Sequence, residues 1–157
     1  MRNSVKLVVS LAIPQLVGIT GAFATMSGVR DWYPELAKPG FTPPAWVFGP
    51  AWTLLYLLMG VALWLVWREA DRNENVRPAL HAFAVQLILN ALWSFVFFGL
   101  RMPGAALVEI ILLWGAILLT IERFRRVSRL AASLLVPYGL WVSFAAVLNA
   151  SIWLLNR

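Results

Sequence analysis

The residues of this chain best suited to chemistry are amides and aromatic rings set inside long apolar segments. One such segment places them three or four residues apart, on a single helical face: Gln86, Asn90, Trp93 and Phe97, with Ser94 adjacent. Two other segments carry comparable side chains: Trp52, Thr53, Tyr56, Tyr138, Trp141, Ala145 and Asn149. An aromatic-lined cavity with a few polar groups is the usual form of a small-molecule site.

The amides also have a simpler interpretation. Polar side chains in a membrane span are costly unless they face protein or a cavity. Gln86, Asn90 and Asn149 could satisfy that requirement by hydrogen-bonding between helices, at roughly 0.6 kcal/mol each. The residues alone leave the ligand cavity and the interhelical bonds both open.

The sequence contains no recognisable catalytic or metal-binding motif beside these residues. The chain has no cysteine and a single histidine, His81, so we expect no metal site and no cofactor. The sequence has no G-x-S-x-G, H-E-x-x-H or phosphate-binding loop. Glu109 is the one acidic residue inside a predicted span, and we expect its carboxyl to be protonated or to reach the membrane interface.

The elements that must position these side chains are membrane-spanning helices. The chain is 61% hydrophobic with a mean hydropathy of +0.77, and its apolar residues come in blocks close to the roughly 20 residues that cross a bilayer. We predict one all-α integral membrane domain over 1–157, a bundle of five transmembrane helices at about 5–26, 45–67, 79–100, 104–121 and 130–155. Short connections predict antiparallel neighbours.

The longest connection is predicted at residues 27–44, between the first two spans. It holds Trp32, Pro34, Pro39 and two further prolines, and proline both fixes φ and removes a backbone donor, so ordinary helix is not expected there. The rise of about 1.5 Å per residue puts the aromatic and amide side chains roughly 8–20 Å below the ends of their spans, beneath this loop. We therefore predict a stiff loop that caps a pocket.

The basic residues are distributed unequally between the two ends of the spans. Of thirteen, nine fall on the side of the N-terminus: Arg2, Lys6, Arg68, Arg72, Arg77, Arg123, Arg125, Arg126 and Arg129. The positive-inside rule then predicts a cytoplasmic N-terminus in a bacterial cell membrane, with an outer membrane as the alternative. Because the charges lie between apolar blocks, we expect the lipid bilayer, and no nucleic acid, as their partner.

Residues 1–24 also resemble a secretory signal peptide. Arg2 and Lys6 precede an apolar stretch, and Ala22-Phe23-Ala24 fits an A-x-A cleavage site. Pro14 interrupts that stretch, as do Gln15 and Gly18. We therefore expect a retained first span.

Several segments, in order along nearly the whole chain, resemble the translocator protein family, also called tryptophan-rich sensory protein or peripheral benzodiazepine receptor. The matching pieces are Trp32-Tyr33, Lys38-Pro39, Thr42-Pro43-Pro44, Trp46-Val47-Phe48-Gly49, Trp52-Thr53-Leu54-Leu55-Tyr56, Gln86, Asn90, Trp93-Ser94, Phe97-Phe98-Gly99, Pro137-Tyr138, Trp141 and Leu148-Asn149. Phe41 stands where the family usually has tryptophan. Ala150 replaces an aromatic residue in the cholesterol segment of the animal members, which argues against sterol binding.

The resemblance implies a homodimer of five-helix bundles that binds porphyrins, such as protoporphyrin IX, and benzodiazepine-type ligands. The residues that it places in the pocket are Tyr33, Pro43, Trp52, Asn90, Ser94, Phe97, Trp141 and Ala145. The analysis of the spans adds Trp93 and Asn149. The expected function is a receptor or sensor that regulates or transports porphyrins. The alternatives are an enzyme that degrades porphyrin in light, with Trp52 and Trp141 as participants, and a transporter of small molecules or sterols.

Overall fold

The regular structure of the protein is helical wherever the computed structural model describes it, over residues 2–157. The α-helices are α1 (Asn3–Ser27), α2 (Ala45–Trp67), α3 (Val76–Ser94), α4 (Pro103–Arg125), α5 (Arg129–Leu134) and α6 (Val136–Leu155). Five helical segments are long and apolar enough to cross a membrane: Asn3–Glu35, Ala45–Trp67, Val76–Gly99, Pro103–Arg125 and Arg129–Leu155. The predicted fold class, an all-α bundle of five spans, is confirmed.

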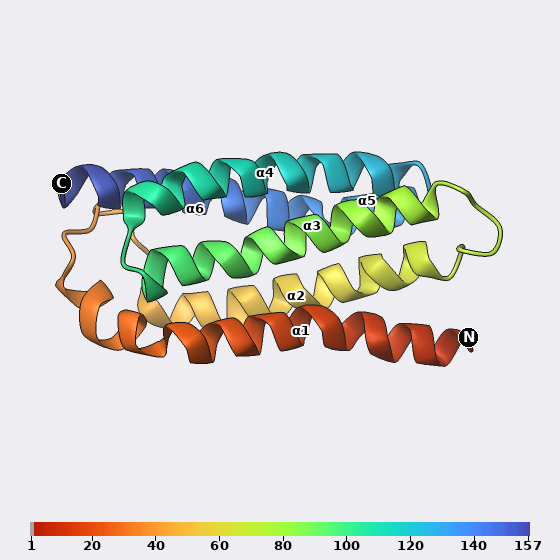
Figure 1. The fold of residues 1–157 in the computed structure, drawn as a ribbon, viewed down its shortest axis with the longest axis horizontal. Coiled ribbons are helices and arrows are strands. Elements are labelled where there is room, and N and C mark those ends of the chain that lie inside the picture. The colour runs from red at the N-terminus through yellow and green to blue at the C-terminus, as the bar shows by residue number, and fades with distance from the viewer. Residues whose placement is uncertain (1) are drawn as a thin grey trace.

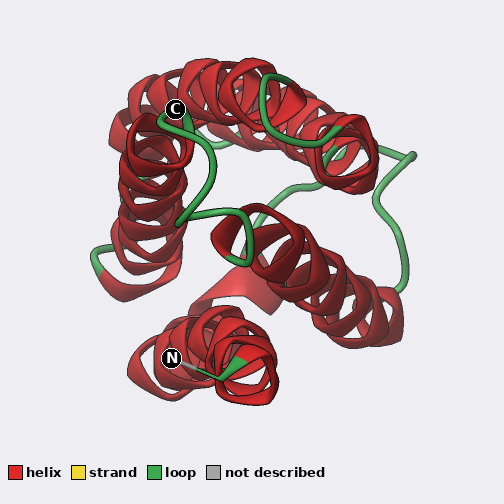
Figure 2. Ribbon diagram, turned by 90° about the vertical axis from the view of Figure 1, so that its right-hand side faces the viewer, coloured by secondary structure: helices red, strands yellow, loops and turns green. Residues whose placement is uncertain are grey.

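The spans run side by side, and the N- and C-termini lie at opposite ends of the bundle (Figure 1). The main contacts join α1 to α2, α3 to α4, and α4 to α6, while α5 packs on α2 and α4. The view along the bundle shows helices connected only by loops and turns (Figure 2). The core between α2, α3, α4 and α6 is filled by side chains that are almost fully buried, including Met59, Ile110, Leu113 and Tyr138.

Glycines allow α1 and α2 to approach closely. A Cβ added at Gly60 of α2 would lie 2.9 Å from the Leu11 Cα and 2.9 Å from the Ser10 carbonyl oxygen, both in the backbone of α1. Gly18 of α1 faces the ring of Tyr56 in α2 in the same way. Small residues at such positions let helix backbones come near enough for dense packing, which is the main attraction between helices in lipid.

The first connection is more helical than we predicted. The helical path of α1 continues through a π-helical turn, η1 (Gly28–Trp32), and a 3₁₀ turn, η2 (Tyr33–Glu35). Pro34 lies in the first turn of η2, where its missing N–H breaks no helical bond. The prediction of loop from residue 27 onward was therefore wrong for 27–35, and the irregular connection is limited to 36–44. Residues 33–44 are called the lid segment below.

The fifth span is divided in two. The α-helix is interrupted at Leu135, between α5 and α6. Pro137 follows two residues later, and a proline cannot donate to the carbonyl four residues earlier and clashes with it. By contrast, α1 and α2 continue through Pro14 and Pro50. The third span also departs from α geometry at its end, with the π-helical turn η3 (Phe95–Gly99).

Two glycine substitutions test the close approach of α1 and α2. We expect Gly60→Ala to destabilise the protein by about 1–3 kcal/mol, because its new methyl group meets backbone rather than a movable side chain. Gly115→Ala in α4 is the control, since nothing lies within 4 Å of its added Cβ. It should be neutral or stabilising by up to about 1 kcal/mol. Thermal unfolding in one detergent measures both, and equal shifts would contradict the packing argument.

Candidate functional site

The larger cavity of the bundle has a volume of about 780 Å³ and lies at the end covered by the lid segment. Its walls come from four spans: α1 between Gln15 and Thr25, α2 between Ala45 and Tyr56, the end of the third span from Trp93, and α6 from Trp141. Tyr33, Pro34 and Lys38 of the lid segment line it as well. Ligand sites in proteins typically enclose roughly 300–1,000 Å³, so this cavity is large enough for a sizeable small molecule.

Most of the residues predicted for a site share this cavity. Eight of the ten line its wall: Tyr33, Trp52, Trp93, Ser94, Phe97, Trp141, Ala145 and Asn149. Two do not. Pro43 lies in the turn that leads into α2, and Asn90 lies beneath the cavity with only 2% of its surface exposed.

Asn90 joins three helices beneath the cavity. The Tyr56 hydroxyl of α2 donates to its Oδ1 at 2.7 Å, and its Nδ2 donates to the Tyr138 hydroxyl of α6 at 3.0 Å. These atoms are buried, so each bond removes a polar group from hydrocarbon. For Asn90 the interhelical interpretation is therefore confirmed, and the residue supports the cavity from below through Tyr56.

Asn149 combines both interpretations that the sequence left open. Its Oδ1 accepts a hydrogen bond from Trp93 Nε1 at 3.1 Å, and its Nδ2 donates to the carbonyl oxygen of Pro103 at 2.7 Å. It thereby ties α6 to the third span and to the start of α4. The same residue lines the cavity.

Aromatic rings hold one another in fixed positions around the cavity. Trp52 stacks on Tyr56 with ring centroids 5.4 Å apart, and Trp93 stacks on Phe97 at 5.4 Å. On α6, Trp141 meets the edge of Phe48 at 5.9 Å. Such offset and edge contacts contribute about 0.5–1.5 kcal/mol each beyond their buried area. The cavity therefore has flat apolar walls that need little rearrangement to receive a planar molecule.

The lid segment is fastened mainly through its own backbone. The Lys38 ammonium donates to the carbonyl oxygens of Tyr33, Pro34 and Leu36 at 2.8, 3.1 and 2.9 Å, and it lies 4.9 Å from the centre of the Tyr33 ring. Asn156, just beyond α6, closes the other side. Its Oδ1 accepts from the Ala37 N–H at 3.0 Å, and its Nδ2 donates to the Ala37 carbonyl at 2.9 Å.

The contribution of α1 to the cavity was not predicted. The residues concerned are Gln15, Gly18, Ile19, Gly21, Ala22 and Thr25. Of these residues, Gln15, Gly18 and Ala22 were considered above only as part of a possible signal peptide. These residues recur at helical spacing on one face of α1, and this was the signal that the sequence offered. Such a face can border a cavity as readily as it can pack against a neighbouring helix.

Three polar or aromatic residues outside the cavity occupy positions that the sequence alone did not decide. Trp114 donates from Nε1 to the Ser143 hydroxyl of α6 at 2.8 Å. Gln86 is 1% exposed, and its side chain has no hydrogen-bond partner within residues 2–157, so the interhelical bond proposed for it is not found. Glu109 is 8% exposed, so its carboxyl does not reach the membrane interface.

A sequence model described as the TspO/MBR family matches residues 10–154. The chain belongs to the TspO/MBR family. It is similar to "Tryptophan-rich protein TspO" of Archaeoglobus fulgidus, with 47% identity over 98% of this chain and 99% of the relative. It is 42% identical to human "Translocator protein" over 83% of this chain and 78% of the relative. "Tryptophan-rich sensory protein" of Cereibacter sphaeroides is 38% identical over 80% and 77%.

The family match and the five apolar spans lead to the same conclusion about the membrane. The match covers all five spans, and each is long enough for the bilayer. The chain is thus an integral, multi-pass membrane protein. The cavity of this TspO/MBR protein lies among its membrane-spanning helices.

Removing the central amide tests the polar network of this TspO/MBR protein. We expect Asn90→Leu to cost about 1–3 kcal/mol, because it leaves two buried tyrosine hydroxyls without their partner. The triple variant Asn90→Leu, Tyr56→Phe, Tyr138→Phe removes the polar groups together and should recover part of that loss. Unfolding free energies in one detergent measure both, and a triple variant less stable than Asn90→Leu would contradict the network.

Asn156 provides a test of the lid segment. We expect Asn156→Ala to speed hydrogen–deuterium exchange at residues 36–42, because the Ala37 N–H loses its acceptor. Ser151→Ala is the matched control, since the Ser151 hydroxyl bonds only to Val147 within α6. Exchange measured by mass spectrometry should change in the first variant alone, and unchanged exchange in Asn156→Ala would show that this contact does not hold the lid.

Proposed function

We propose that this TspO/MBR protein is a membrane receptor or sensor that binds a tetrapyrrole, such as protoporphyrin IX, in the cavity beneath the lid segment. The observation that carries the proposal is a cavity of about 780 Å³ with stacked aromatic walls inside the membrane-spanning helices. A tetrapyrrole is a broad, flat, apolar ring, and flat rings gain most from aromatic faces already held in place. A bacterial relative carries the name "Tryptophan-rich sensory protein".

The polar groups of the cavity suit the edge of such a ring. Lys38 is the one ionised side chain among the described residues that line the cavity, and it lies in the lid segment. The carboxylates of protoporphyrin IX sit on one edge of the macrocycle, so we place that edge toward Lys38 and the apolar remainder toward Trp52 and Trp141. The three N–H groups of Lys38 already donate to carbonyl oxygens of the lid segment, so its contribution to this orientation would be the Coulomb attraction between the ammonium and a carboxylate.

The same cavity would accept benzodiazepine-type ligands. These are smaller aromatic molecules with few polar atoms, and the Ser94 hydroxyl lies in the wall as a partner for such atoms. Binding of a tetrapyrrole or of a benzodiazepine-type ligand in this cavity would allow the protein to regulate or transport porphyrins.

We further propose that the N-terminus is cytoplasmic in the cell membrane. The support is the excess of basic residues at that end of the bundle, nine of thirteen, which the positive-inside rule places in the cytoplasm. The lid segment would then lie on the outer side.

Tryptophan substitutions test the proposed site. Titration of the purified protein with protoporphyrin IX, followed by tryptophan fluorescence, should give weaker binding for Trp52→Phe and Trp141→Phe. Loss of one aromatic contact of about 0.5–1.5 kcal/mol corresponds to a roughly two- to tenfold higher Kd.

The control for this titration is Trp114→Phe. Trp114 lies on α4, is 41% exposed and does not line the cavity, so its replacement should leave the Kd unchanged. Indistinguishable affinities in wild type and all three variants would count against this cavity as the porphyrin site.

A further inference from the structure

A tetrapyrrole often carries a metal ion at its centre, and the lining of the larger cavity decides whether the protein can bind that metal. Proteins hold the iron of a haem through the side chains of histidine, cysteine, methionine or tyrosine. Among residues 2–157, the lining contains no histidine, cysteine or methionine. His81, the single histidine of the chain, lies in α3 at the end of the bundle opposite the lid segment.

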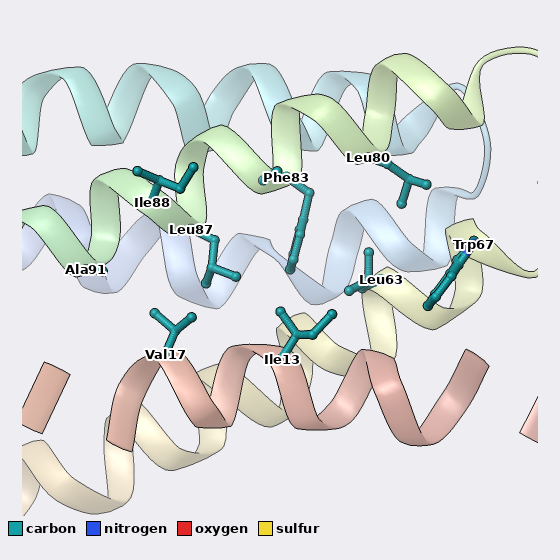
Figure 3. A pocket seen from close by; sticks show the side chains of 10 residues that line it. Ile13, Val17, Leu63, Trp67, Leu80, Phe83, Leu87, Ile88 and Ala91 are labelled. Atoms are coloured by element: carbon teal, nitrogen blue, oxygen red, sulfur yellow. The ribbon is translucent and has the colours of Figure 1, made fainter. Parts of the chain in front are cut away.

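The smaller cavity offers no metal ligand either. It is a groove of about 460 Å³ between α1 and α3, with α2 behind it. Figure 3 shows Ile13 and Val17 of α1 pointing toward Phe83 and Leu87 of α3. All ten residues that line the groove are hydrophobic, so it has no ligand for the metal of a tetrapyrrole and no charged partner for its carboxylates.

Two tyrosines and a lysine are the remaining candidates in the wall of the larger cavity. The Tyr56 hydroxyl donates a hydrogen bond to Asn90 Oδ1 at 2.7 Å, which holds its proton in place. The Lys38 ammonium uses its three N–H groups on lid carbonyls, and a protonated amine has no lone pair for a metal. Tyr33 would have to lose its phenolic proton, and no carboxylate or imidazole in the described lining is present to accept it.

Several parts of this wall are too short to reach a metal at the centre of a ring. Ala145 lies one helical turn beyond Trp141 on α6, and Gly21 and Gly49 lie on α1 and α2. A Cβ added at either glycine would meet no atom within 4 Å. The cavity thus offers aromatic carbon and open space to the faces of a bound ring, rather than a strong metal ligand.

We propose that the cavity binds its tetrapyrrole without any bond from the protein to a central metal. This inference rests on the proposed function. Affinity then comes from the aromatic contacts of the ring and from its carboxylates, so the metal-free ring is a full ligand. An iron ion in the ring keeps only small exogenous axial ligands such as water. The ring lies against Ala145, between Trp141 and the third span.

Titration of the purified wild type compares protoporphyrin IX with its zinc(II) and iron(III) complexes. We expect neither metal complex to bind more tightly than the metal-free ring, because an axial bond from the protein would add roughly tenfold or more in affinity. The bound iron(III) complex should give the electron paramagnetic resonance spectrum of a high-spin haem with water as its ligand. Tyr33→Phe and Lys38→Gln should leave that spectrum unchanged.

A histidine placed in the wall should supply the missing ligand. We expect Ala145→His to show an iron–histidine stretching band in the resonance Raman spectrum of the reduced haem complex, and an excess of metal-free protoporphyrin IX should remove the band. Val147→His is the matched control, because Val147 lies on the same helix, is 58% exposed and does not line the cavity. Thermal unfolding identifies a variant that fails to fold, and Ser94→His on the third span then replaces Ala145→His.

Three results would overturn this inference while leaving the proposed function in place. One is tenfold tighter binding of either metal complex than of the metal-free ring. Another is a wild-type spectrum with a phenolate or amine ligand that Tyr33→Phe or Lys38→Gln abolishes. The third is normal haem affinity without an iron–histidine band in the folded histidine variant. Absence of saturable binding of protoporphyrin IX to the wild type would instead overturn the proposed function, and this inference with it.

Discussion

Hydrocarbon offers no hydrogen-bond partner, so each polar group in the spans of this protein must find one inside the bundle or remain unpaired. Asn90 meets this constraint by binding Tyr56 on one side and Tyr138 on the other. Asn149 meets it through Trp93 and the Pro103 carbonyl. Together these bonds fix the third span against α2 and α6, and α6 against the start of α4. The stacked rings of the cavity wall rest on the same side chains, because Tyr56 and Trp93 each carry a stacking partner.

The first helix takes no part in that network, and this explains where the empty space lies. Its close packing is with α2, through Gly60 and the Gly18–Tyr56 contact, whereas its contacts with α3 are few. Both cavities are lined by α1, the smaller one through Ile13 and Val17 and the larger one through residues between Gln15 and Thr25. They differ in chemistry because Gln15, Asn149 and Lys38 line only the one beneath the lid segment. The other is lined by hydrophobic residues alone.

The lid segment is held by a different kind of interaction. Its fastening uses backbone carbonyls around Lys38 and the two bonds between Asn156 and Ala37. Such bonds can exchange with water at a membrane surface, so their net contribution is about 0.5–1.5 kcal/mol each. Ring contacts of Tyr33 with Phe97 and Phe98, and of Phe41 with Phe144, add apolar packing between the lid segment and the bundle.

The sequence by itself determined the all-helical class, the five spans and the helical faces that carry Trp52, Trp93, Trp141 and Asn149. These follow from apolar block length and from the period of the helix, both of which are local properties. Only the tertiary structure decided that Asn90 supports the cavity while Asn149 lines it, that α1 contributes a wall, and where the fifth span is interrupted. Those outcomes depend on how each helix is rotated and spaced against segments far away in the chain. A contact such as that between Asn90 and Tyr138, which are 48 residues apart, cannot be predicted from the periodicity of a single sequence.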